Sequence, residues 1–331
     1  MTARFDRIAQ EPLEKLLLPG GALHMLAVAP GRLNSQRVPL VAHLRADRMT
    51  IYAGLTKLLQ IRIAGPVLAV SAAAAYARQP CAHRLIGTYP LTEAGQIVQR
   101  WSAYRDHVEV AARYVRREGI LQASLVERYG PGFQQGDDWC VVDREAVITY
   151  PNATQRRAYE APVNDELRPV RLRIEADVAI RTGKKLRHDF GRELDLLAVT
   201  NDGDLLLGEV KDGTDTAGTY LAPLQLAGYL QMWRDLATTT TSTLHATINA
   251  MIDQRERIGL LGRNAPRLRH GFRVLPALFI SPPATRSTAW QSLDIVAGHL
   301  RALQPRALDG LRTFSVTMGD SGLELTLRAC A

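Results

Sequence analysis

Apolar and polar residues follow two different periods along the chain, and these periods predict a β-rich first part. Between Ala22 and Ala74, short apolar runs are separated by Gly, Pro, Asn and Asp, which is typical of strands joined by turns. The predicted strands cover residues 22–29, 38–46, 49–55 and 65–72. From Thr92 to Glu118 the apolar residues recur at helical spacing, as they do over 120–130. A strand predicted at 139–150 follows.

The second half of the chain alternates between helical and strand periods. Pro169 suits the first turn of a helix on which Val170, Ile174 and Val178 share a face, although the same letters also alternate as in a strand. Strands are predicted at 184–190, 193–199 and 204–211, with the turn sequence Thr-Asn-Asp-Gly-Asp joining the last two. Further on, the pattern predicts helices at 221–236, 244–261 and 289–303, and strands at 274–281, 311–318 and 323–327.

This order of elements predicts an α/β protein with two domains. Residues 150–167 are polar and short of core-forming side chains, so we place the domain boundary there. The first domain, residues 1–155, is a β-rich α/β domain suited to recognition or regulation. The second, residues 160–331, has a mixed central sheet flanked by helices.

Composition narrows the class of protein. The chain has 331 residues, 46% hydrophobic and 22% charged, and no apolar run long enough to cross a bilayer, so no membrane partner is expected. Residues 1–21 lack the apolar centre of a secretory signal, which favours a cytoplasmic protein. Cys81, Cys140 and Cys330 lie far apart and predict neither a disulfide framework nor a zinc cluster. The formal charge of +8 and pI near 9.6 favour a polyanionic partner.

The predicted hairpin carries charge at positions expected to face a dry interior. Glu209 and Lys211 lie two residues apart and therefore share a strand face, and the turn brings Asp195 close to Glu209. Two desolvated carboxylates repel each other unless a cation lies between them, and oxygen ligands suit Mg²⁺ or Mn²⁺. We therefore predict a metal held by Asp195, Glu209 and the carbonyl of Val210, with Lys211 stabilising charge on a phosphate or positioning the attacking hydroxide.

These residues resemble the PD-(D/E)xK nuclease superfamily, with Asp195 as its aspartate and Glu209-Val210-Lys211 as its (D/E)xK element. The likeness is closest to nuclease domains of the NucS type, with Leu194 in the place of the superfamily's nominal proline. It covers about residues 166–280 and implies a restriction-endonuclease-like core.

The helix expected after the hairpin extends the resemblance. Gln225 and Tyr229 lie four residues apart, hence on one face, and resemble the QxxxY element of RecB-type nucleases, which helps to hold the attacking water and the nucleic-acid strand. The superfamily also takes an acidic residue from the helix before the sheet, for which Glu175 matches by position and Glu166 is the substitute. Glu193 is a second-choice ligand.

The remaining charged residues near the hairpin have simpler interpretations. His188 is read as a surface residue, and Arg187 and Arg192 as contacts to a phosphate backbone. A single Glu-x-Lys is by itself a common surface ion pair; Asp195 and the Gln-Tyr pair favour the nuclease interpretation. The chain has no P-loop, dinucleotide fingerprint or nucleophile elbow.

The expected function is that of a metal-dependent endonuclease acting on nucleic acid, favouring DNA, in antiviral defence or repair. A double-strand cut would require two active sites, and hence a homodimer or a partner protein. Two alternatives stay open. One is a non-catalytic nuclease-like module that binds nucleic acid or a partner protein; the other is a ligand-gated nuclease whose first domain senses a nucleotide.

Overall fold

The computed structural model describes residues 3–33, 38–109, 115–177, 180, 193–319 and 322–328. The chain divides into two compact units. Unit 1 comprises Met1–Phe5, Asp143–Ala246 and Leu268–Ala331, and unit 2 comprises Asp6–Val142 and Thr247–Arg267. The division therefore passes through strand β7 (Trp139–Ala146) and helix α8 (Thr241–Ile258), not between residues 155 and 160. None of the described helices combines the length and apolarity needed to cross a membrane.

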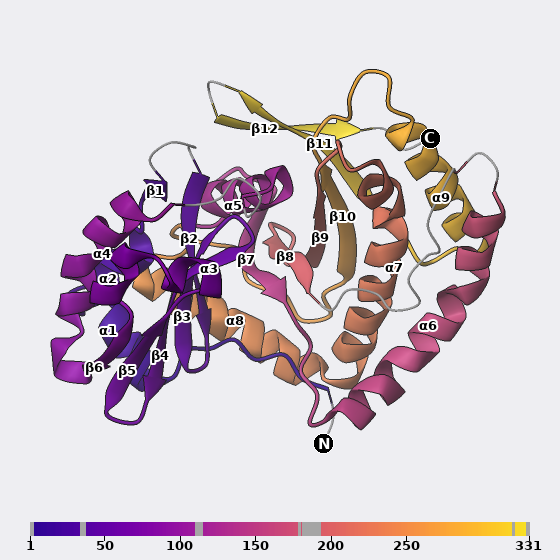
Figure 1. The fold of residues 1–331 in the computed structure, drawn as a ribbon. Helices are drawn as coiled ribbons and strands as arrows, with labels where there is room; N and C mark the ends of the chain where they lie inside the picture. The colour runs from indigo at the N-terminus through magenta and orange to yellow at the C-terminus, as the bar shows by residue number, and fades with distance from the viewer. Residues whose placement is uncertain are drawn as a thin grey trace. The chain divides into compact units, whose positions relative to one another are not determined.

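An antiparallel sheet organises unit 2, with each strand paired to the next along the chain (Figure 1). Its strands are β1 (Arg32–Leu33), β2 (Val38–Arg45), β3 (Arg48–Ala53), β4 (Thr56–Ala64), β5 (Val67–Ser71) and β6 (Gly87–Pro90). The helices of this unit are α1 (Glu11–Leu17), α2 (His24–Val28), α3 (Ala74–Ala77), α4 (Gly95–His107) and α5 (Arg117–Tyr129), with 3₁₀ turns at Pro80–Arg84 and Leu91–Glu93.

The first part of the chain is β-rich, as predicted, but its elements differ in detail. The strands expected at 38–46, 49–55 and 65–72 are confirmed, whereas the strand expected at 22–29 is wrong, because that segment forms α2. Leu23, Leu26 and Ala27 are buried there at a spacing of three and four residues, which is a helical period too short to recognise in one turn. Strands β4 and β6 were not predicted.

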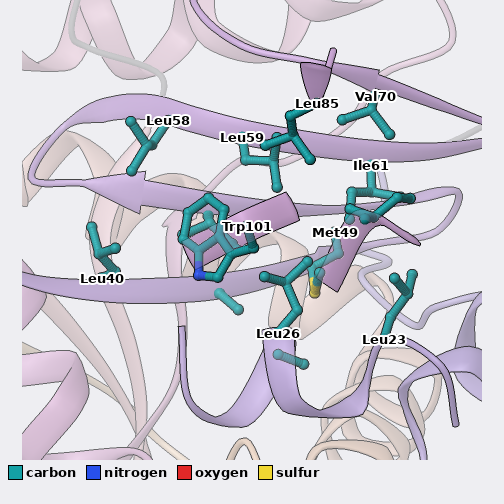
Figure 2. Close-up of a cluster of buried hydrophobic side chains, with 14 of the residues drawn as sticks. Leu23, Leu26, Leu40, Met49, Leu58, Leu59, Ile61, Val70, Leu85 and Trp101 are labelled. Atoms are coloured by element: carbon teal, nitrogen blue, oxygen red, sulfur yellow. The ribbon is translucent and has the colours of Figure 1, made fainter. Parts of the chain in front are cut away.

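Aliphatic side chains from the sheet and helices of unit 2 interlock in one core (Figure 2). Leu59 and Ile61 of β4 and Met49 of β3 are fully or almost fully buried, as are Leu26 of α2 and Trp101 of α4. The same core includes Ile258 and Leu260, which follow far along the chain. This burial explains why residues 247–267 belong to unit 2.

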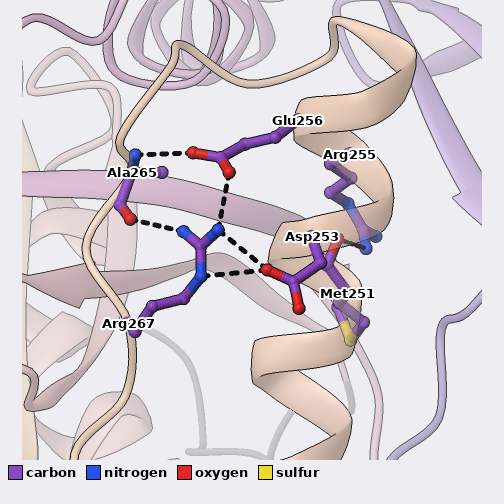
Figure 3. Close-up of polar contacts among 6 residues, drawn as sticks. All are labelled: Met251, Asp253, Arg255, Glu256, Ala265 and Arg267. Carbon is purple, nitrogen blue, oxygen red and sulfur yellow. Dashed lines mark hydrogen bonds and ion pairs between the residues drawn. The ribbon is translucent and has the colours of Figure 1, made fainter.

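Polar contacts also hold residues 247–267 in unit 2. The Gln254 amide accepts from Ala9 N–H at 2.7 Å and donates to the Ala9 carbonyl at 2.9 Å. Arg267 donates to Asp253 at 2.8 Å and to Glu256 at 2.6 Å, both on α8, and Glu256 accepts from Ala265 N–H at 2.7 Å (Figure 3). A guanidinium that bridges two carboxylates in this way ties the chain after α8 back onto the helix.

Unit 1 contains a mixed sheet in the order β12-β11-β10-β9-β8-β7. β9 is antiparallel to β8 and parallel to β10, β10 is parallel to β11, and β11 is antiparallel to β12. The bounds are β8 (Leu194–Thr200), β9 (Leu205–Lys211), β10 (Val274–Ile280), β11 (Arg312–Gly319) and β12 (Gly322–Arg328). Its other helices are α6 (Ala153–Ala176), α7 (Thr216–Thr239) and α9 (Ala289–Leu303).

Helices flank this sheet, which confirms the mixed α/β class predicted for the second half. Helix α7 lies against β9 and β10, and α6 and α9 pack beside α7 (Figure 1). Strand β9 is buried along its whole length, as expected for a central strand covered by other elements. The predicted strand at 184–190 lies outside the described residues.

Helix α6 corrects the prediction for residues 150–167. The segment is the first half of a 24-residue helix, not a linker, and Pro169 lies inside this helix instead of starting it. Val163, Leu167, Val170 and Ile174 form one buried stripe, while Pro162 and Pro169 lie on the exposed face. A helix that buries a single stripe is polar in overall composition, so composition alone made it resemble a linker.

The turn between β8 and β9 forms as predicted, and a buried carboxylate holds it. Gly203 adopts the left-handed conformation with φ 75°. The fully buried Asp204 accepts from Arg273 N–H at 2.8 Å, from the Arg273 guanidinium at 2.6 Å and from Arg269 at 3.0 Å. Burial alone would raise the pKa of Asp204, but these hydrogen bonds and charges outweigh it and lower the pKa. The hairpin is thereby fixed to the start of β10.

We predict that Asp204→Asn lowers the free energy of unfolding by about 2 kcal/mol at neutral pH, because charge-assisted hydrogen bonds are lost. Because the pKa of Asp204 is lower in the folded chain than in the unfolded chain, the ionised carboxylate stabilises the fold at pH values above the unfolded-state pKa. This stabilisation is lost as the pH falls through the folded-state pKa. The difference between wild type and variant in urea unfolding should therefore shrink below about pH 4. Asp202→Asn, in the exposed part of the same turn, is the control; equal effects of the two substitutions would contradict this role.

Candidate active site

The ends of β8 and β9 bring the predicted strand residues to one place. The two strands are antiparallel with Leu196 opposite Gly208, and one step further along this register Asp195 lies opposite Glu209. Residues directly opposite each other in an antiparallel pair have their side chains on the same face, and Lys211 shares that face with Glu209. The sequence therefore folds so that an apolar hairpin presents two carboxylates and one ammonium together.

Lys211 lies between the two carboxylates. Its Nζ atom is 2.5 Å from Glu209 Oε1 and 3.8 Å from Asp195 Oδ2. The side chain of Glu209 is 0% exposed, that of Lys211 10% and that of Asp195 16%. The cluster is thus nearly dry, and the ammonium supplies the positive charge that the carboxylates need there.

Asp195 is the most exposed of the three side chains in this cluster. Its Oδ2 atom accepts a hydrogen bond of 2.8 Å from Val210 N–H. Burial raises the pKa of the Asp195 carboxyl, while the charge of Lys211 and the Val210 hydrogen bond oppose that rise. The N–H and C=O of one strand residue point to the same side, so the Val210 carbonyl also faces the β8 edge where Asp195 lies.

Gln225 and Tyr229 of α7 lie beside this cluster, in a hydrogen-bonded pair. Gln225 Nε2 donates to the Tyr229 hydroxyl at 3.2 Å, and that hydroxyl donates to the Glu193 carbonyl at 3.1 Å. Burial raises the pKa of Tyr229, and the charge of Glu209 raises it further, so the phenol stays protonated. Tyr229 thereby ties α7 to the residue that precedes β8.

The other predicted carboxylates occupy different surroundings. Glu175 is exposed in the last turn of α6, in contrast to the buried Glu209. Glu166 is also exposed and accepts a hydrogen bond from Gln231 of α7. The side chain of Glu193 is exposed, as an outward-facing residue would be. His188, Arg187 and Arg192 lie outside the described residues.

Two charged residues of β7 belong to the same surroundings and were not predicted. The Arg144 side chain is fully buried, with Nη2 3.2 Å from Glu145 Oε1. Successive strand residues normally point to opposite faces, but Glu145 has φ 47°, a left-handed conformation that lets the two side chains meet. Arg144 lowers and Glu145 raises the pKa of Asp195. The signal in the sequence was the run Asp-Arg-Glu inside an apolar strand.

The oxygen atoms at this site fit a hard divalent cation. Asp195 and Glu209 supply carboxylates and Val210 a carbonyl, the ligand types that Mg²⁺ and Mn²⁺ prefer, and Mg²⁺ commonly keeps several waters beside one or two protein carboxylates. Within the described residues no group of three or more His, Cys, Asp or Glu could hold a metal, and this site offers two carboxylates and one carbonyl. The Lys211 ammonium already pairs with Glu209, so it would have to move away from this carboxylate before a metal ion could bind there.

Comparison with protein-family models, curated proteins and solved structures gave no match for this chain.

We predict that Lys211→Met lowers the free energy of unfolding by about 3 kcal/mol in EDTA, because it leaves a buried carboxylate without its cation. Adding Glu209→Gln should recover most of that loss in urea unfolding. Asp195→Asn should cost less than Lys211→Met, because burial already disfavours the charged form of Asp195. Wild-type stability in Lys211→Met would show that the ammonium does not neutralise the site.

Proposed function

We propose that this protein is a metal-dependent nuclease of the PD-(D/E)xK type that hydrolyses phosphodiester bonds in nucleic acid, favouring DNA. The observation that carries the proposal is the meeting of Asp195, Glu209 and Lys211 on one face of neighbouring strands, almost out of contact with water. The order α6, β8, β9, α7, β10, with the charged residues on β8 and β9, supports a restriction-endonuclease-like core.

The residues divide the chemistry between them. Asp195, Glu209 and the Val210 carbonyl would hold Mg²⁺ or Mn²⁺, which when bound polarises a phosphoryl oxygen and lowers the pKa of a water. Lys211, withdrawn from Glu209, donates to a phosphate oxygen and stabilises the charge that develops there. In the net reaction water adds to phosphorus and one P–O ester bond breaks, which leaves a phosphate monoester and a hydroxyl.

Gln225 and Tyr229 are positioning residues in this proposal. The Tyr229 hydroxyl already donates to the Glu193 carbonyl, so its contribution is to hold the start of β8 and to orient Gln225. Gln225 then faces the nucleic-acid strand or the attacking water. Arg144 is fully buried, and its positive charge lowers the pKa of Asp195. It therefore favours the ionised carboxylate that a cation requires.

The charge of the whole chain suits such a substrate. A formal charge of +8 attracts nucleic acid electrostatically, and this attraction does not depend on the nucleotide sequence. Antiviral defence and repair, within the cytoplasm, are roles compatible with a DNA nuclease. A double-strand break would take two copies of the site, from a homodimer or a partner.

One contact favours a second candidate function. The ammonium of Lys211 lies 2.5 Å from Glu209, and in a non-catalytic module this ion pair would be a permanent structural feature. Such a module would bind nucleic acid or a partner protein without cutting.

We predict cleavage of supercoiled, linear or single-stranded DNA in Mg²⁺ or Mn²⁺, with RNA as a parallel substrate. Asp195→Ala and Lys211→Ala should each lower the rate by about 10²-fold or more, as loss of a group that stabilises transition-state charge does. Asp202→Ala, an exposed carboxylate in the same hairpin, should cleave like wild type.

Retention of wild-type activity by Asp195→Ala would overturn the assignment of the site. Binding of DNA by wild type with no cleavage in either metal would favour the non-catalytic module. In that case Lys211→Ala should alter stability and leave DNA affinity almost unchanged.

A further inference from the structure

A cavity of about 370 Å³ adjoins the candidate active site in unit 1. Its walls come from the segment after β7, the first turns of α6, and α7. Tyr229 belongs to both places: its hydroxyl contacts Gln225 and Glu193, and the residue also lines the cavity. One helical turn further along α7, about 5.4 Å, Trp233 lines the same cavity. The cavity and the candidate active site therefore share Tyr229 as a wall residue.

The lining combines aromatic and apolar groups with a few polar ones. The lining residues include the aromatic Tyr150, Tyr229 and Trp233, the apolar Ile148 and Met232, and the charged Arg156 and Glu160. The volume falls at the lower end of the range for small-molecule pockets, about 300–1,000 Å³. These are the properties of a site for a flat heteroaromatic ring with polar edges.

The walls are held in place before any ligand binds. The segment that carries Tyr150 is fixed by a bridge in which Arg4 and Thr149 exchange backbone hydrogen bonds of 3.0 and 2.8 Å. The Trp233 ring packs edge-on against Phe5 with centroids 5.0 Å apart. Tyr150 packs against Tyr159, whose hydroxyl donates to the Met232 carbonyl at 2.8 Å. Preformed walls lower the entropy cost of binding.

The polar groups have hydrogen-bonding capacity to offer. Arg156 Nε is buried and has no hydrogen-bond partner among the described residues, and its nearest carboxylate oxygen, on Glu160, is 3.7 Å away. That distance is too long for a hydrogen bond. A guanidinium donates to ring nitrogens and carbonyl oxygens of bases, and a carboxylate accepts from exocyclic amines.

We infer that this cavity binds a nucleobase of the substrate strand, next to the phosphate that is cut. The inference rests on the proposed function and adds a substrate class to it. A base can enter only if it is unstacked, so the substrate is single-stranded nucleic acid or a duplex whose base is extruded. Arg156 and Glu160 together favour a base that carries an exocyclic amine over thymine or uracil.

The test uses single-stranded DNA in which one nucleotide at a time is replaced by an abasic residue. Wild type should cleave about tenfold more slowly when the missing base is at one fixed position relative to the cut, since stacking on aromatic side chains is lost. Ala153→Trp, which adds bulk at an exposed residue of the cavity lining, should cleave intact and abasic strands alike at the lower rate. Ala158→Trp, exposed elsewhere on α6, is the matched control and should behave like wild type.

A second variant guards against misfolding. Glu160→Gln removes the charge that would accept from an exocyclic amine without adding bulk, and it should reduce the preference for amine-bearing bases while leaving the thermal unfolding midpoint unchanged. Asp165→Asn, an exposed carboxylate on the same helix, should keep the preference.

Binding measurements separate this inference from the proposed function. In Asp195→Asn, the affinity for the intact strand should exceed that for the abasic strand by about tenfold. That difference without any cleavage by wild type would support the pocket and contradict the nuclease. Cleavage that is insensitive to every abasic position would support the nuclease and overturn the pocket. A thermal shift with free nucleoside monophosphates, combined with no abasic effect, would also overturn it, because the cavity would then serve a free nucleotide.

Discussion

A nearly dry ion cluster at the ends of two strands is the constraint on which the second half of this protein depends. Glu209 is completely buried, and the Lys211 ammonium at 2.5 Å offsets its charge there. Removing two charges from water costs several kcal/mol per ion, and their attraction repays this only in a close geometry. Replacing a buried ion pair by apolar residues of similar volume is often neutral or stabilising, so the buried charges support the proposed chemistry.

The rest of unit 1 supports that cluster from three sides. Asp204 fixes the far end of the β8–β9 hairpin to Arg273, Tyr229 ties α7 to the start of β8, and β7 contributes a buried arginine. The end of β9 is equally confined: a Cβ atom on Gly213 would lie 1.9 Å from the Ser281 carbonyl oxygen. Each of these contacts limits how far Asp195 and Glu209 can move apart, as a site for a small cation requires.

Local chemistry made much of this arrangement predictable. Turn residues and apolar runs located the hairpin, and the two-residue period placed Glu209 and Lys211 on one face. Sequence could not supply the discontinuous units, because Ile258 and Leu260 join a core whose other members precede them by more than a hundred residues. Nor could it supply Arg144, whose approach to Glu145 depends on one left-handed backbone angle. The first half of helix α6 was missed because a single buried stripe leaves a polar composition.

The proposed cation site is tested most directly by measuring Mn²⁺ binding with electron paramagnetic resonance, in the presence of a cleavage-resistant phosphorothioate DNA strand. If Asp195 and Glu209 form a cation site, wild type and Asp202→Asn should bind Mn²⁺ with equal affinity. Glu209→Gln should bind Mn²⁺ at least about tenfold more weakly. Equal Mn²⁺ affinity in all three proteins would contradict the account, because Glu209 would then be a partner of Lys211 and nothing more.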